Sequence, residues 1–118
     1  MPLSAIFLSG IVFGLGTDAT IVSHYSPFVT LGWVVSGLDL AGRRVLDETV
    51  TREEALIAHT RSNAYLFFQE DSLGSLELGK QADLVVLDRD YLTVPAAEIK
   101  DIEPTLTMVG GRVVFKRP

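Results

Sequence analysis

The first half of the chain opens on apolar residues and then loses its regular pattern. Residues 2–8 predict a short helix that Gly10 ends. Residues 11–16 form a continuous apolar run with β-forming side chains, which predicts a strand buried on both faces, as in a parallel α/β sheet. Residues 21–47 are rich in Gly, Ser and aromatic side chains without a clean period. We therefore expect a long loop there, with one helical turn around residues 27–35.

The clearest helix signal lies in residues 51–68. Thr51 and Glu54 have the spacing of a capping box, in which the threonine hydroxyl accepts from the amide of Glu54 and the carboxylate reaches back to Thr51. Glu53 and Glu54 also suit the positive N-terminal end of a helix. Apolar residues then continue the helical pattern to about Phe68.

The remainder of the chain predicts strands. A β-rich run flanked by acidic residues fills residues 82–88, and one helical turn is predicted at residues 95–99 because Pro suits the first helical position. Residues 105–109 and 112–115 predict two strands joined by Gly110-Gly111. That two-glycine link is a strong hairpin signal, because the turns that join adjacent strands need positive φ.

This order of elements leaves one strand without neighbours. The fold class is α+β, with a small antiparallel sheet from the C-terminal half and the helix from Thr51 packed on it. The apolar strand at residues 11–16 needs a neighbour on each side, and the chain supplies none. Because exposed apolar edges invite pairing, we expect a partner copy in a homo-oligomer, a partner chain or missing sequence to cover this strand.

Composition narrows the class of protein. The chain has 118 residues, 47% hydrophobic and 21% charged, which indicates one globular domain at most. The net charge is -5 and no basic run exceeds Arg43-Arg44, so we expect no nucleic acid as a partner, because phosphate binding needs clustered Lys and Arg. The lack of cysteine excludes disulfides and thiolate metal sites.

The uncharged start of the chain predicts neither a leader nor a membrane anchor. Residues 1–16 lack the basic region of a signal peptide, and the apolar run stops at Asp18, short of the ~20 residues that a membrane span needs. We expect no membrane association and a cytoplasmic location.

Four stretches carry motifs that occur in one family in the same order. Residues 14–19 read GLGTDA, and residues 54–64 contain EAL followed by HTRSNA. Residues 74–88 read GSLELGKQADLVVLD, and residues 107–114 read TMVGGRVV. Together they resemble the C-terminal segment of metal-dependent amidohydrolases, in the branch of YtcJ-like (amidohydrolase family 3), imidazolonepropionase- and dihydroorotase-related hydrolases.

The resemblance implies a fold and an activity. Family members are (β/α)8 barrels with a small β-sandwich built from both chain ends. Residues 1–70 would be the last β/α unit of the barrel, and residues 71–118 would be sandwich strands with the terminal hairpin. The chain would be a segment of a metal-dependent hydrolase that acts on non-peptide C–N (amide-type) bonds of small-molecule substrates. We expect the isolated chain to be inactive, because the other barrel strands are missing.

The resemblance assigns the chemistry to Asp18. In the family this aspartate binds or faces a divalent metal, usually zinc, takes a proton from the metal-bound water and returns it to the leaving group. The other ligands come from earlier strands and include a His-x-His pair. This chain has only His24 and His59, which match no family ligand position. A single carboxylate does not hold zinc, whose catalytic sites use about three protein ligands.

Each of the other polar and aromatic residues considered for the site also has a structural interpretation. His24 follows the loop after residues 11–16 and is a candidate for substrate binding, with an ordinary loop residue as the alternative. For His59 on the capped helix, packing or solvent contact is expected. Tyr25, Phe28 and Trp33 could line a substrate pocket or belong to the core. We interpret Lys80 as a lysine in a turn whose side chain is solvated.

Three hypotheses about the whole protein stay open. The chain is a segment of an amidohydrolase, or a non-catalytic remnant that folds by oligomerising, or one half of a split enzyme whose metal-binding half is another chain. Upstream sequence with a His-x-His pair would support the amidohydrolase segment. A metal-free dimer that depends on protein concentration would support the non-catalytic remnant. Co-purification with a larger barrel chain would support the split enzyme.

Overall fold

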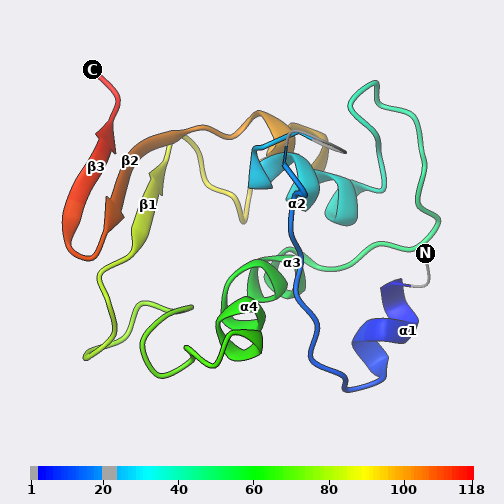
Figure 1. Ribbon diagram of the computed structural model, residues 1–118. Coiled ribbons are helices and arrows are strands. Elements are labelled where there is room, and N and C mark those ends of the chain that lie inside the picture. Colours follow the sequence, from blue (N-terminus) through cyan, green and yellow to red (C-terminus); the bar gives the residue numbers. More distant parts are fainter. Residues whose placement is uncertain (1–2, 20–23) are drawn as a thin grey trace.

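The computed structural model describes residues 3–19 and 24–118 of the chain and has an α+β architecture. Figure 1 shows a sheet on one side of the molecule and helices on the other. The elements follow in the order α1 (Leu3–Leu8), α2 (Pro27–Ser36), α3 (Arg52–His59), α4 (Arg61–Leu66), β1 (Leu84–Leu87), the 3-10 helix η1 (Ala96–Asp101), β2 (Pro104–Val109) and β3 (Arg112–Lys116).

The sheet is the part of the fold that its local sequence describes best. Its strand order is β1-β2-β3 and both pairings are antiparallel, with Thr107 opposite Val85 on one side and opposite Phe115 on the other. Gly110 and Gly111 have φ of 56° and 77°, as the predicted hairpin turn requires. The hairpin prediction is confirmed.

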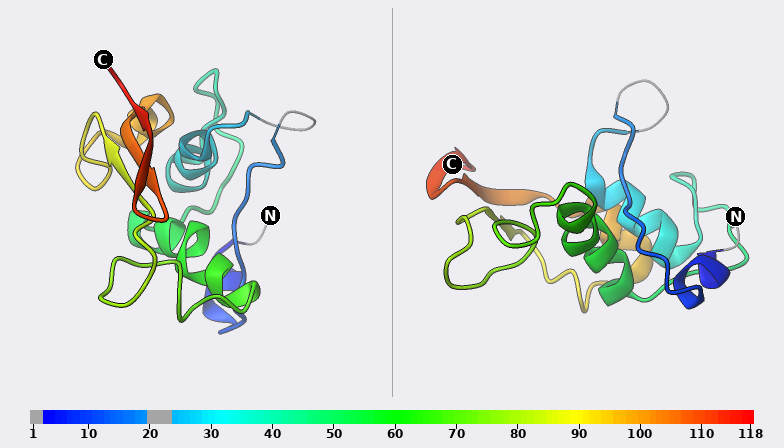
Figure 2. Two further views of the ribbon diagram at one scale, coloured as in Figure 1. Left: turned by 60° about the vertical axis from the view of Figure 1, so that its left-hand side comes forward. Right: turned by 60° about the horizontal axis from the view of Figure 1, so that its bottom comes forward.

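Among the described residues, no further layer covers this sheet. Val86 is 48% exposed and Val114 is 61% exposed, although both are β-branched residues typical of buried strands. Figure 2 shows β2 and β3 extending away from the helices. The sheet therefore presents apolar side chains to solvent in this chain.

The core lies between α2 and η1. Val34 of α2 and Ile99 of η1 are fully buried, and a Cβ placed on Gly32 would lie 3.1 Å from the backbone nitrogen of Lys100, so the two helices approach closely at this glycine. The buried apolar residues of the core are Leu3, Phe28, Leu31, Val34, Leu46, Val50, Ala55, Tyr91, Ile99 and Ile102.

Helix α2 is longer than the single turn predicted from the sequence. It runs for ten residues, because Pro27 occupies its first turn and Gly37 caps it in the left-handed conformation at φ 73°. Its residues are apolar on most sides, which hides the helical period in a sequence pattern. Pro27 at the start and Gly37 at the end were the sequence signals for the length of this helix.

The long helix predicted over residues 51–68 is two helices. Its capping box is confirmed, since Glu54 N–H donates to Thr51 Oγ1 (3.2 Å) and Thr51 N–H donates to Glu54 Oε2 (2.8 Å). The break falls at Thr60, whose φ and ψ are -122° and -81°. Its hydroxyl donates to Leu56 O (2.7 Å), a back-bond that commonly bends helices.

The prediction that this helix packs on the sheet is wrong. Helix α3 packs against α2 and α4 instead. A cavity of about 900 Å³ lies between α3–α4 and β1, with Leu56 and Phe67 on one side and Leu84 on the other. Residues of α3, α4 and β1 thus line opposite sides of this cavity.

The buried strand predicted at residues 11–16 does not form in this chain. The segment is extended, but within the described ranges it pairs with no strand, and Ile11 and Val12 are 71% and 45% exposed. The cause is the missing neighbour on each side, since a strand needs partners for its ladder. Phe13 instead packs edge-on against Phe7, with ring centroids 4.5 Å apart.

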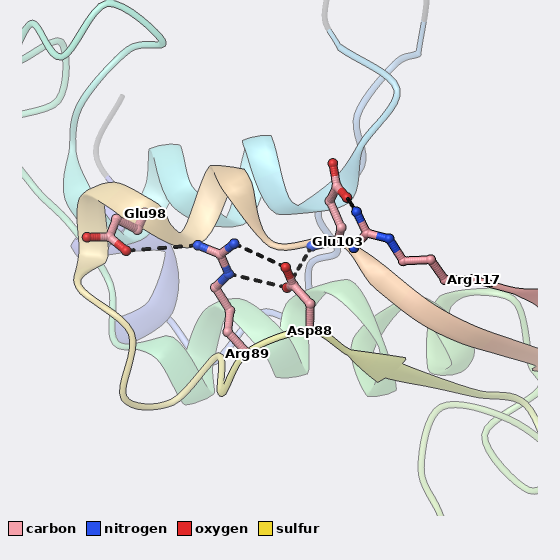
Figure 3. Close-up of polar contacts among 5 residues, drawn as sticks. All are labelled: Asp88, Arg89, Glu98, Glu103 and Arg117. Atoms are coloured by element: carbon pink, nitrogen blue, oxygen red, sulfur yellow. Dashed lines mark hydrogen bonds and ion pairs between the residues drawn. The ribbon is translucent and has the colours of Figure 1, made fainter.

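A polar network joins the end of β1 to the start of β2 (Figure 3). Asp88 N–H donates to Glu103 O and Glu103 N–H donates to Asp88 Oδ1, both at 3.0 Å. Arg89 binds the Asp88 carboxylate at 3.0 Å and lies 3.9 Å from Glu98, while Arg117 lies 2.9 Å from Glu103. Arg89, and then the Glu103 amide, lower the pKa of Asp88. These contacts link the residues that follow β1 to those that precede β2.

Within the described residues, none of the helices combines the length and the apolar character that crossing a bilayer requires.

Candidate functional site

Asp18 ends the extended segment on the surface of the molecule. Its side chain is exposed, and its φ of 49° lies in the left-handed region that aspartate adopts more readily than most residues. Among the contacts between described residues, no hydrogen bond or ion pair involves its carboxylate. Thr20 and the start of the predicted loop, residues 21–23, lie outside the described residues.

The backbone just before Asp18 is fastened to the helices. Leu15 N–H donates to Ala58 O (3.1 Å), and the Leu15 carbonyl accepts from Asn63 Nδ2 (2.9 Å). The apolar pattern of residues 11–16 gave no hint of these contacts. A glycine at position 14 and an asparagine inside a helix at position 63 were the available signals, since both residues are unusual in regular elements.

His24 lies on the other side of the residues that are not described. It is exposed, its Nδ1 accepts from the Ser26 N–H (3.1 Å), and its ring stacks on Tyr25 with centroids 4.5 Å apart. Because Nδ1 is an acceptor, the neutral ring carries its proton on Nε2, which is then available as a donor. The contacts of the described residues do not join His24 to Asp18.

His59 is held by packing. It is the last residue of α3, it is half-buried, and its Nε2 has no hydrogen-bond partner among the described residues. Burial lowers the pKa of this imidazole, so the ring is neutral near pH 7. His59 is thus partly buried, with its Nε2 enclosed and the rest of the residue partly open to solvent.

A cavity opens beside the residue that precedes Asp18. It has a volume of about 690 Å³ and is lined by Gly16 and Thr17, by Trp33 of α2 and by Lys100 of η1, among others. The aromatic residues of the predicted loop therefore divide: Phe28 is a core residue, whereas Trp33 is 37% exposed and lines this cavity.

Lys80 is not the solvated turn lysine that the sequence suggested. Its side chain is only 16% exposed, its Nζ donates to Ser75 Oγ (2.7 Å), and it lies 3.4 Å from the Glu77 carboxylate. Because these partners lie three and five residues away, Lys80 organises the turn before β1. That role is structural.

The described part of the chain does not form a metal centre by itself. Across residues 3–19 and 24–118, no three His, Asp or Glu side chains gather as metal ligands. Asp18, His24 and His59 remain apart from one another in the contacts that the structure records. Asp18 is thus one donor of a set that would need residues from elsewhere.

Comparison with known proteins gives the family. A family model described as the amidohydrolase family matches residues 2–115. The chain belongs to the amidohydrolase family. Members of this family are generally metal-dependent hydrolases.

Two curated proteins are similar in sequence to this chain over nearly its whole length. The N-substituted formamide deformylase of Arthrobacter pascens is 31% identical over 117 residues, which are 98% of this chain and 21% of that protein. The imidazolonepropionase of Porphyromonas gingivalis is 30% identical over 114 residues, which are 97% of this chain and 25% of that protein. The amidohydrolase chain therefore spans between a fifth and a quarter of the length of these relatives.

A solved structure shares the fold. The crystal structure of an amidohydrolase from Thermotoga maritima MSB8 superposes with a TM-score of 0.69 at 23% identity, over 98% of this chain and 26% of that one. The arrangement of helices and sheet described above thus corresponds to about a quarter of that longer chain.

Proposed function

We propose that the chain is the C-terminal portion of a metal-dependent hydrolase that cleaves non-peptide C–N bonds, with Asp18 as its catalytic carboxylate. Residues 1–70 would form the last β/α unit of the barrel, and residues 71–118 the C-terminal sandwich strands. The observation that carries the proposal is an exposed, unpaired Asp18 at the end of an extended segment fastened to α3 and α4 within the described chain. Family membership and the two relatives support it.

The role of Asp18 follows from its surroundings. A carboxylate that accepts a proton from an attacking water, and then donates it to the leaving nitrogen, needs lone pairs that no neighbouring group occupies. Asp18 meets that requirement in this structure, because no described group binds it. A divalent metal, zinc first among the candidates, would supply an activated water, but its remaining ligands would have to come from outside the described residues.

The substrate is proposed to be a small amide-type molecule. N-substituted formamides are the first compounds to assay, since the deformylase relative is named for them, and imidazolonepropionate is the second. His24 is the proposed substrate-binding residue. Its exposed ring has Nδ1 occupied by the Ser26 amide, which leaves an Nε2–H that could donate to a substrate oxygen.

The exposed apolar side chains support the proposal that another polypeptide segment or chain covers this surface. Ile11, Val12 and the sheet residues Val86 and Val114 are all between 45% and 71% exposed. We propose that the remaining barrel portion, on the same polypeptide or on a partner chain, covers them in the active protein. Failing that, the isolated chain would form a homo-oligomer through the same residues. A monomer at micromolar concentration in sedimentation analysis would contradict the oligomer.

The deciding experiment measures metal and hydrolysis together. The protein is purified without chelator in the polypeptide or complex in which the cell produces it, as wild type, Asp18→Asn and Asp47→Asn. Asp47 is an exposed aspartate at a distance in sequence, so it controls for the loss of one charge. We expect metal and formamide hydrolysis in the wild type and in Asp47→Asn, and a loss of hydrolysis of about 100-fold or more in Asp18→Asn.

Other results would favour the other two hypotheses. A metal-free oligomer of this chain without hydrolysis would indicate the non-catalytic remnant. Metal and activity that appear only when a larger barrel chain co-purifies would indicate a split enzyme. Equal hydrolysis by the wild type and Asp18→Asn would overturn the catalytic role of Asp18.

A further inference from the structure

The strongest candidate outside Asp18 itself is the asparagine that binds the backbone before it. Asn63 Nδ2 donates to the Leu15 carbonyl at 2.9 Å and to the His59 carbonyl at 3.1 Å. The Leu15 N–H donates to Ala58 O at 3.1 Å. Both backbone hydrogen-bonding groups of Leu15 are therefore satisfied by α3 and α4 and not by a strand.

Gly14 completes this contact. A Cβ placed on Gly14 would lie 1.8 Å from Asn63 Oδ1 and 3.0 Å from Asn63 Cγ. The φ of Gly14 is not positive, so conformational freedom does not explain the glycine. The close approach does, because the Asn63 amide occupies the space in which any larger residue would place its Cβ. Gly14 and Asn63 thus form an interlock that aligns the segment on the helices.

Asp18 lies close in sequence to this interlock. It follows Leu15 by three residues, so its Cα lies within roughly 11 Å of the anchored carbon atom of Leu15. In the contacts between described residues, no hydrogen bond is recorded for Gly16, Thr17 or Asp18. Leu15 itself packs against the core, which makes its backbone a fixed reference point.

We propose that Asn63 is a positioning residue that sets the location of the Asp18 carboxylate through the Leu15 carbonyl. The inference rests on the proposed function, in which Asp18 transfers a proton. A displacement of about 1 Å at such a group costs on the order of 100-fold in rate. Because Asp18 is proposed to act in proton transfer, we expect the effect to fall on kcat and to leave KM within about twofold.

The variants separate positioning from packing. Asn63→Asp keeps the shape of the side chain but replaces the donor that binds the Leu15 carbonyl. Gly14→Ala introduces the clash, and Gly14→Ala combined with Asn63→Ala relieves it, because the new methyl group enters the space that the amide leaves. The double variant therefore restores the packing without restoring the hydrogen bond to Leu15.

The kinetic readout is measured on the protein in its natural polypeptide or complex. We expect Asn63→Asp to lower kcat about 100-fold with KM nearly unchanged. The double variant should regain thermal stability relative to Gly14→Ala while its kcat stays low. Recovery of both stability and kcat in the double variant would overturn the proposal, since Asn63 would then act by packing alone.

Amide hydrogen exchange provides a readout that does not depend on activity. In Asn63→Asp the amide of Leu15, which donates to Ala58 O, should exchange about tenfold faster, whereas the amide of Val34 in the α2 core should be unchanged. Unchanged exchange at Leu15 would overturn the interlock. If the wild type hydrolyses nothing and Asp18→Asn changes nothing, the proposed function fails, and the exchange rates still decide whether Asn63 holds the segment.

Discussion

The hydroxyl of Tyr91 donates a hydrogen bond to the carbonyl oxygen of Arg52 at 2.9 Å, and the Arg52 guanidinium returns a hydrogen bond to the carbonyl oxygen of Tyr91. The guanidinium also binds the Val94 carbonyl. This reciprocal pair joins the first residue of α3 to the segment that follows β1, with Tyr91 only 5% exposed. It links the helical part of the chain to the part that carries the sheet.

Removal of the Tyr91 hydroxyl should destabilise the chain. Tyr91→Phe leaves the Arg52 carbonyl without this donor, and we expect a loss of about 1 kcal/mol in the free energy of unfolding. Tyr65→Phe is the matched control, because Tyr65 is 52% exposed. Urea unfolding of the two variants measures the difference. Equal stability of the two variants would show that the reciprocal pair contributes nothing.

Tyr91 should also make the chain sensitive to alkaline pH. Burial raises the pKa of Tyr91 from 10.0 to about 12, despite the opposing effect of Arg52. The unfolded state ionises first, so the stability contributed by the neutral hydroxyl is complete below about pH 10 and is lost as the pH rises toward 12. We expect the stability of the wild type to fall more steeply than that of Tyr91→Phe in this window. Parallel pH profiles would contradict the assignment.

Two glycines with similar backbone angles should respond differently to alanine. Gly74 and Gly79 have φ of 88° and 92°, so each substitution carries the strain of a positive φ, on the order of 1 kcal/mol. A Cβ on Gly74 would lie 2.7 Å from Ala64 Cβ, whereas a Cβ on Gly79 would meet nothing within 4 Å. Gly74→Ala should therefore cost about 1–3 kcal/mol more than Gly79→Ala. Thermal unfolding of both variants checks this, and a second change, Ala64→Gly, should recover part of the difference.

The capping box at α3 should be worth a measurable part of the stability. Thr51→Ala removes the acceptor for the Glu54 amide, and we expect a loss of about 1 kcal/mol. Thr51→Ser keeps a hydroxyl at the same position and should lose little. Circular dichroism during thermal unfolding compares them, and an equal loss in both variants would place the effect in the threonine methyl group.

Asp18 should be dispensable for folding. Its carboxylate is exposed and has no partner within the described structure, so Asp18→Asn should change the free energy of unfolding by less than about 0.5 kcal/mol. The measurement is the unfolding midpoint beside that of Asp47→Asn. A large loss of stability confined to Asp18→Asn would show that the carboxylate has a structural role and would weaken its catalytic assignment.

The elements predicted correctly are those whose signals are local. The Gly110-Gly111 link specifies its turn through positive φ, and Thr51 with Glu54 specifies a helix start through contacts three residues apart. Such interactions need no distant residue, so they are visible in a short stretch of sequence. The family motifs were visible for the same reason, and the family model confirms them.

The sequence alone determined the family, the hairpin and the capped helix, and it offered Asp18 as the candidate catalytic residue. Tertiary structure decided the rest, because the deciding contacts join residues far apart in the chain. Residues 11–16 have a strand's composition yet lack strand neighbours, so Asn63 and Ala58 satisfy the backbone of Leu15 instead. Strand formation depends on partners, and a hydrogen bond across 48 residues has no local sequence pattern.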